Sequence, residues 1–86
     1  RLFIYPSPND GRFTIAYFNS GASTSRNVAV YDAKGALIFQ QQFAIAQPYQ
    51  LLPINMQSAA SGIYMVMVRD AAGNKVASGK VMINHH

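Results

Sequence analysis

The chain of 86 residues lacks cysteine, tryptophan and glutamate, and its only histidines are the last two residues. Without cysteine it can form no disulfide, no thiolate zinc site and no cysteine nucleophile. The three carboxylates, Asp10, Asp32 and Asp70, each stand in a predicted turn, where an aspartate side chain accepts hydrogen bonds from the nearby backbone. The six glycines form no phosphate-binding loop ahead of a helix. We therefore expect that the chain is not an enzyme and uses no cofactor or metal.

Charge is also scarce, because only 12% of the residues are charged. Seven Lys and Arg residues against three Asp give a net charge of +4, but the cations are scattered along the chain. A nucleic-acid interface normally clusters its cations, so scattered cations favour solvated surface positions. No apolar run approaches the roughly 20 residues that a membrane-spanning helix needs. We expect neither a nucleic-acid partner nor a transmembrane segment.

The residues at the two ends of the chain indicate where the domain begins and ends. It begins at Arg1 rather than at Met and has no signal-peptide pattern, so we interpret it as a fragment of a longer protein. His85 and His86 follow the end of the last predicted strand region at Asn84, and we interpret them as the remnant of a purification tag. Residues 1–84 are then one domain, since this length does not allow two.

The hydrophobic pattern is that of short strands throughout. Branched and aromatic residues form runs separated by turn residues about every ten positions. Seven strands are predicted, at residues 2–5, 12–19, 27–31, 36–43, 49–54, 63–69 and 75–83. Pro48 and Pro53 put the fifth strand at a sheet edge, because proline cannot donate to a ladder. Seven short antiparallel strands predict an all-β, immunoglobulin-like sandwich, although a barrel has a similar pattern.

Two turns of the form Asp-x-x-Gly join consecutive strands, at residues 32–35 and 70–73. Aspartate at the first position and glycine at the fourth predict a type I turn followed by a bulge with glycine in the left-handed region. Such a bulge can shift cross-strand pairing by one residue. The side chains of the last strand that share a face with those of residues 63–69 therefore stay open at this stage.

The strand at residues 63–69 is apolar on both faces. If Tyr64, Val66 and Val68 point inward, Met65 and Met67 lie outside and form a candidate docking face, since methionine adapts to varied partners. The alternative is that the methionines occupy the core or lie under a loop. The tyrosines present a similar choice, between a carbohydrate-binding face and rings packed inward with wet hydroxyls; they are Tyr5, Tyr17, Tyr31, Tyr49 and Tyr64.

Four short motifs follow one another in order over residues 2–84. The first is a tyrosine, a Pro-x-Pro and a glycine at residues 4–13, and the second is a strand that ends in a turn glycine at residues 28–35. The third is a Gly-x-Tyr at residues 61–66, and the fourth a lysine and an apolar strand at residues 73–83. In this order and spacing they resemble the type A C-terminal sorting domain of proteins exported by the type IX secretion system of Bacteroidetes. Ser7 stands where that family usually has Asn, and Met67 where a charged residue is common.

This resemblance implies transport rather than catalysis. Such a domain follows an N-terminal cargo domain, passes through the periplasm, and is recognised by the outer-membrane translocon and its shuttle protein. A surface sortase then removes it, and the cargo reaches the outer surface or the medium. The family-motif positions in this sequence are Pro6, Pro8, Gly11, Gly35, Gly62, Tyr64, Gly73, Lys80, Val81 and Ile83.

Physical roles follow for these positions. Pro6 and Pro8 would stiffen the entry, and Gly62 would let the chain enter the strand that carries Tyr64. The last strand, residues 75–83, would meet the translocon by β-augmentation, and an exposed edge would also allow a weak dimer. The alternative function is an immunoglobulin-like accessory domain that binds carbohydrate or a neighbouring catalytic domain.

Overall fold

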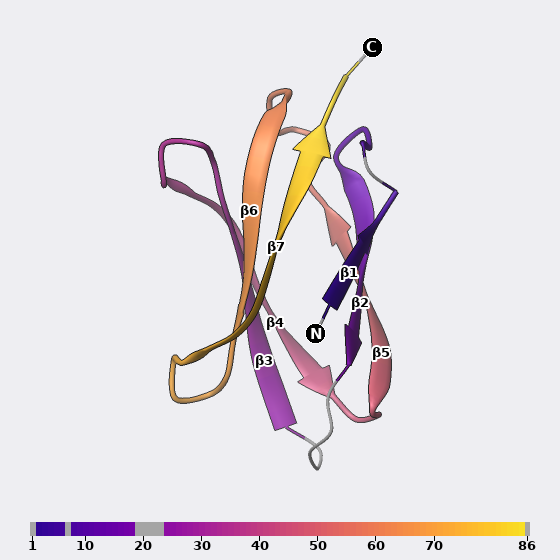
Figure 1. Ribbon diagram of the computed structural model, residues 1–86, viewed down its shortest axis with the longest axis vertical. Helices are drawn as coiled ribbons and strands as arrows, with labels where there is room; N and C mark the ends of the chain where they lie inside the picture. The colour runs from indigo at the N-terminus through magenta and orange to yellow at the C-terminus, as the bar shows by residue number, and fades with distance from the viewer. Residues whose placement is uncertain (1, 7, 19–23, 86) are drawn as a thin grey trace.

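The computed structural model describes residues 2–6, 8–18 and 24–85, and within these ranges the chain forms seven strands (Figure 1). The strands are β1 (Leu2–Tyr5), β2 (Arg12–Phe18), β3 (Thr24–Tyr31), β4 (Leu37–Ile45), β5 (Tyr49–Asn55), β6 (Gly62–Arg69) and β7 (Lys75–Ile83). All seven predicted strands are confirmed, with shifted ends. β3 begins three residues earlier than predicted, because it pairs with β4 along its whole length. Asn19, Ser7 and residues 20–23 lie outside the described residues. The described part contains no helix that could cross a membrane.

The strands form two antiparallel sheets that face each other (Figure 1). One sheet has the order β1-β2-β5 and the other the order β4-β3-β6-β7, which confirms the predicted sandwich and places β5 at an edge. In constant-type immunoglobulin domains the fourth strand belongs to the first sheet. Here β4 lies beside β3, because the tight turn at residues 32–35 returns the chain antiparallel to the strand it has just left.

The space between the sheets is filled by the inward side chains of both. Alternation along β2 and β6 buries Phe13 and Ile15 of one sheet and Val66 and Val68 of the other in the same cluster. The buried cluster is Phe13, Ile15, Tyr17, Val28, Val30, Ile45, Leu52, Ile54, Met56, Tyr64, Val66, Val68, Val81 and Ile83. Among the described residues the only buried polar one is Asn9, which is 8% exposed. A single polar residue in an apolar interior points to a specific structural task.

The two Asp-x-x-Gly turns have the same geometry. Gly35 and Gly73 have φ values of 88° and 90°. The Asp32 Oδ1 atom accepts hydrogen bonds from two backbone N–H groups at 2.9 Å, and Asp70 Oδ1 accepts two at 2.9 and 3.0 Å. The bonds from Asn74 lower the pKa of the Asp70 carboxyl below its ordinary value. The predicted turns and left-handed glycines are therefore confirmed.

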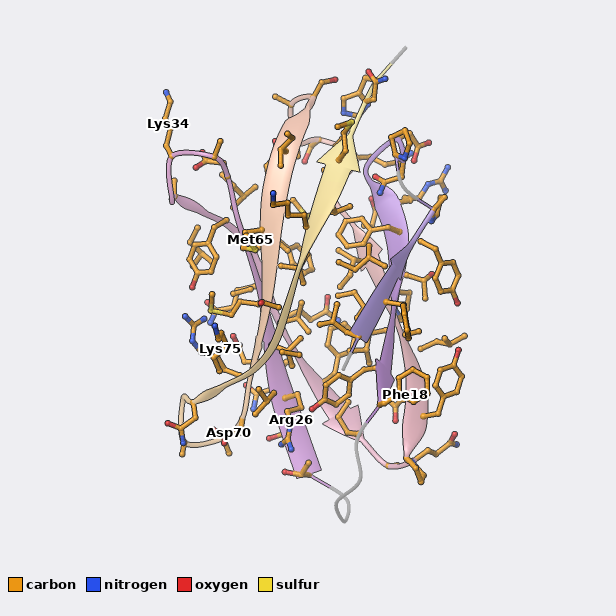
Figure 2. All side chains as sticks on the ribbon, viewed as in Figure 1. Phe18, Arg26, Lys34, Met65, Asp70 and Lys75 are labelled. Carbon is orange, nitrogen blue, oxygen red and sulfur yellow. The ribbon has the colours of Figure 1, made fainter. Side chains whose placement is uncertain are left out.

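Each turn is followed by a shift in register. The pairing of β3 with β4 shifts between Val30 and Tyr31, and that of β6 with β7 shifts between Val68 and Arg69. The two hairpins lie at opposite ends of the four-stranded sheet, as the labelled Lys34 and Asp70 show (Figure 2). Because of the second shift, Met65 lies opposite Lys80 and Met67 opposite Ser78. Lys80 and Ser78 are therefore the residues of β7 that share a face of the sheet with the two methionines.

Candidate functional site

The opening motif and the closing strand meet at the end of the sandwich that carries the C-terminus (Figure 1). Asn9 links them through its backbone: its N–H donates to the Met82 carbonyl at 3.0 Å, and its carbonyl accepts from the Asn84 N–H at 2.7 Å. Its side chain binds its own segment, donating to the Pro6 carbonyl at 3.0 Å and accepting from the Gly11 N–H at 2.8 Å. We call this set, Pro6, Asn9, Gly11, Met82 and Asn84, the terminal junction. It joins the two ends of the chain into one structural unit.

Gly11 is the most constrained position in the terminal junction. Its φ of 107° lies in the left-handed region. A Cβ atom there would lie 2.7 Å from the Met56 carbonyl oxygen and 2.8 Å from the Gln57 Cα, both backbone atoms. The Met56 N–H donates to the Gly11 carbonyl at 2.7 Å, which holds this approach closed. Glycine is therefore required at position 11 both by conformation and by space.

Asn9 directly precedes Asp10 in a predicted turn, and its long-range role could not be seen from the sequence. We expect Asn9→Ala to lower the free energy of unfolding by about 2 kcal/mol, because it leaves the buried Gly11 N–H and the carbonyl of Pro6, whose hydrogen bond is part-buried, without their partner. Urea unfolding followed by circular dichroism measures this change.

Asn55→Ala is the matched control for that variant. The Asn55 side chain also accepts a hydrogen bond from a backbone N–H two residues ahead, that of Gln57 at 3.1 Å, but it is exposed. We expect its loss to cost at most about 0.5 kcal/mol. Equal losses for the two variants would contradict the role assigned to Asn9.

The remaining motif positions divide between the core and the surface. Tyr64, Val81 and Ile83 are buried, and the Tyr64 hydroxyl donates to the Ala60 carbonyl at 2.6 Å. Pro6, Pro8 and Lys80 are exposed, and Gly73 lies at the opposite end of the sheet from the terminal junction. A Cβ at Gly62 would make only an ordinary contact of 3.8 Å, and its φ lies outside the left-handed region. Neither space nor conformation therefore requires glycine at the entry to β6.

The methionines lie on the outer face of the four-stranded sheet, as one of the two alternatives predicted. Met65 is 36% exposed and Met67 is half-buried, while Val66 between them is buried. Figure 2 places Met65 and Lys75 on this sheet. We call this surface the methionine face; it consists of Tyr31, Ile63, Met65, Met67, Lys80 and Met82.

Cationic side chains border the methionine face. Lys80 pairs with Met65 across the strands, and Lys75 pairs with Arg69 at the far end of β7. The Arg69 Nη1 donates to the Tyr31 hydroxyl at 3.0 Å, and its guanidinium lies 5.8 Å from the centre of that ring. The face thus combines an adaptable apolar centre with positive charge, which suits a partner with an apolar surface and carboxylates around it.

The last strand is an edge of its sheet, as predicted, but part of this edge is covered. Asn9 forms a parallel bridge with Ile83 at the C-terminal end of β7. Further back along the strand, Gly79 lies opposite Val66, and side chains of β1 cover its inner side: the ends of Leu2 and Ile4 would be 3.0 and 3.2 Å from a Cβ there. The outer face of β7 is therefore open, whereas its inner side and the C-terminal end of its edge are covered.

A second apolar surface, on the outer face of the three-stranded sheet, was not predicted. The ring of Phe18 lies 6.0 Å from that of Phe3 and 4.7 Å from that of Tyr49, measured between centroids. Figure 2 places Phe18 on this sheet. We call this surface the aromatic face; it consists of Phe3, Tyr5, Phe18, Tyr49 and Leu51, all of which are exposed. Small residues in the centre of β2, Thr14 and Ala16, were a signal for it, since they face outward between the rings.

The five tyrosines neither form one exposed face nor all pack their rings inward. Tyr17 and Tyr64 are buried, whereas Tyr5 and Tyr49 are exposed on the aromatic face and Tyr31 belongs to the methionine face. A surface depression of about 240 Å³ is lined by Asn27, Gln40, Gln42, Arg69 and Asp70 among others, and its Arg69 side chain also binds the Tyr31 hydroxyl. Within residues 2–6, 8–18 and 24–85, no cluster of three acidic or histidine side chains could hold a metal ion.

Comparison with known proteins identifies one match. The family model described as secretion system C-terminal sorting domain matches residues 3–84. No curated protein matches the chain. The matched range begins inside β1 and ends at Asn84. It therefore includes every residue of the terminal junction, and it covers all seven strands except the first residue of β1.

Proposed function

Because the chain belongs to the family of secretion-system C-terminal sorting domains, the sorting signals of type IX secretion, we propose that it directs an attached cargo protein across the outer membrane. In this proposal the translocon and its shuttle protein recognise the folded domain in the periplasm, and a surface sortase removes it. The observation that carries the proposal is the family match over nearly the whole chain. The role requires binding and no chemistry by the chain itself.

We assign recognition to the methionine face. It lies on the sheet that contains the C-terminal strand, and Lys80 of β7 directly neighbours Met65 of β6. Flexible methionine side chains can adapt to a partner that handles many different cargo proteins. The cations at its border favour a partner surface that carries carboxylates.

Export of a passenger tests the proposal. Residues 1–84 are fused to the C-terminus of a periplasmic fluorescent protein in a Bacteroidetes host, with an otherwise identical host that lacks the type IX translocon as control. We expect the passenger outside the cell, without the domain, only in the host with an intact translocon. A folded fusion that stays in the periplasm of both hosts would overturn the proposal.

The methionine face is tested by Met65→Asp in the same fusion. A carboxylate at this position places negative charge in the apolar centre that the partner is proposed to contact, so we expect export to fall by about tenfold or more. Surface fluorescence and the fraction of cleaved passenger measure the change.

Leu51→Asp is the matched control, because it introduces the same charge on an outward strand position of the other sheet, where Leu51 is 48% exposed. We expect this variant to be exported normally. Equal export of the two variants, with both domains folded by circular dichroism, would remove the methionine face from the recognition surface.

The aromatic face favours one second candidate, an accessory domain that binds carbohydrate. Exposed aromatic rings on a flat sheet can stack on sugar rings. This candidate predicts binding to a polysaccharide array that Phe18→Ser abolishes, together with failure of the passenger to leave the periplasm. Export of the passenger without any glycan binding would exclude it.

A further inference from the structure

The two open sheets have four edge strands, and three of them carry features that oppose pairing with another chain. Pro53 lies within β5, and Lys75 and Lys80 lie on β7, whose end is also bridged by Asn9. β1 has only four residues. Short edges, prolines, lysines and covering segments are the usual protections against edge-to-edge association.

β4 is different from the other edges. It has nine residues, Leu37–Ile45, and contains no charge, no proline and no glycine. It is the outermost strand of the four-stranded sheet and pairs only with β3. The register shift beside its first residues leaves the stretch from Phe39 to Phe43 regular. An uncharged, regular edge of this kind is a template for another strand.

The sequence of β4 is nearly symmetric about its centre. It reads Leu-Ile-Phe-Gln-Gln-Gln-Phe-Ala-Ile, with Gln41 in the middle, Gln40 and Gln42 on either side, and Phe39 and Phe43 beyond them. In antiparallel pairing of two copies centred on Gln41, each of these residues faces one of the same type. Self-complementarity of this kind is what a twofold interface requires.

We propose that β4 is a self-association site, at which two copies of this chain pair antiparallel with Gln41 opposite Gln41. Phe39 of one copy then lies beside Phe43 of the other on the inner side, where both are half-buried in the single chain. The glutamines form the centre of the contact. Two four-stranded sheets become one continuous sheet.

The backbone of β4 is oriented for this pairing. The Ala44 carbonyl accepts a hydrogen bond from Gln50 Nε2 at 2.8 Å, and Gln50 belongs to β5, so this carbonyl points away from β3. In an antiparallel ladder the outward backbone groups of an edge strand recur at every second residue. Gln40 and Gln42 therefore also turn N–H and C=O outward, and the proposed register sets them opposite each other.

The pairing closes after two copies. Among the strands that the structure describes, β4 is the one unprotected edge, so a pair leaves only edges that are short or carry lysine, proline or a covering segment. An interface of one strand pair is small, and we expect a weak association, with a dissociation constant on the order of 100 µM. The product is a discrete dimer rather than a fibre.

Sedimentation equilibrium of the 86-residue chain from about 10 µM to about 1 mM tests the proposal. Gln41→Lys puts two like charges opposite each other and should raise the dissociation constant at least about fivefold. Gln57→Lys is the matched control, because it adds the same charge at an exposed position outside the strands. It should leave the dimer unchanged.

A charge-pairing experiment identifies the register. Gln41→Lys and Gln41→Glu should each be monomeric alone and should form a heterodimer when mixed in equal amounts, because opposite charges then face each other. A monomeric wild-type chain at the highest concentration, open-ended aggregation, or a dimer that Gln41→Lys leaves intact would each overturn the proposal. None of these outcomes affects the sorting function, which the export experiment tests separately.

Discussion

Gly11→Ala is expected to remove about half of the stability of the domain. The new Cβ would lie 2.7 Å from the Met56 carbonyl oxygen and 2.8 Å from the Gln57 Cα. Backbone atoms cannot turn away as a side chain can, so the β2 entry and the segment after β5 must separate. The hydrogen bond from the Met56 N–H to the Gly11 carbonyl, at 2.7 Å, is lost with them. Together with the positive φ this costs on the order of 4 kcal/mol, from a total of roughly 5–10 kcal/mol for a domain of this size.

Gly35→Ala separates the cost of conformation from the cost of space. Gly35 also has a positive φ, of 88°, but a Cβ there has no neighbour within 4 Å. We expect this variant to lose only about 1 kcal/mol. Urea unfolding of both variants at one temperature gives the comparison. If Gly11→Ala lost no more stability than Gly35→Ala, the close approach to Met56 would not be what requires glycine.

The features that sequence predicted well are those whose cause is local. Each Asp-x-x-Gly turn is stabilised by hydrogen bonds within five consecutive residues. The Asp-x-x-Gly pattern therefore predicts both the turn and the left-handed glycine. The alternation in β6 likewise puts Met65 on the face opposite to that of Tyr64 and Val66, although it leaves open which of the two faces is the outer one. Periodicity and turn chemistry therefore predict the strands and the side chains that share a face.

The features that were missed depend on contacts between distant segments. Asn9 looks like a turn residue until the end of β7 is placed beside it, because its backbone partners are Met82 and Asn84. Gly11 looks like another turn glycine until the Met56 backbone approaches it. Which strand is an unprotected edge also depends on the pairing order, since nothing within β4 itself states that only β3 lies beside it.

Because Asn9 binds Met82 and Asn84, a truncation at the C-terminus affects folding as well as recognition. Deleting Lys80–Asn84 is expected to abolish export of a fused passenger, but it also removes Val81 and Ile83 from the core and both backbone bonds of Asn9. Losing two buried aliphatic side chains costs at least about 4 kcal/mol, so the truncated domain should be unfolded as well. Loss of export after truncation therefore reports on folding as much as on recognition.

A variant that changes only the outer side of β7 separates the two effects. Lys80→Ser combined with Met82→Ser alters two exposed side chains of the methionine face, and it keeps Val81, Ile83 and the backbone hydrogen bonds of the terminal junction, in which Met82 takes part only through its carbonyl. We expect this double variant to unfold at nearly the wild-type urea concentration and yet to leave the passenger in the periplasm, because the partner reads the surface and not the core. Its comparison with the truncation is made by circular dichroism of the purified domain and by surface fluorescence of the fusion. Normal export of the double variant would mean that a folded sandwich suffices and that the outward side chains of β7 carry no part of the signal.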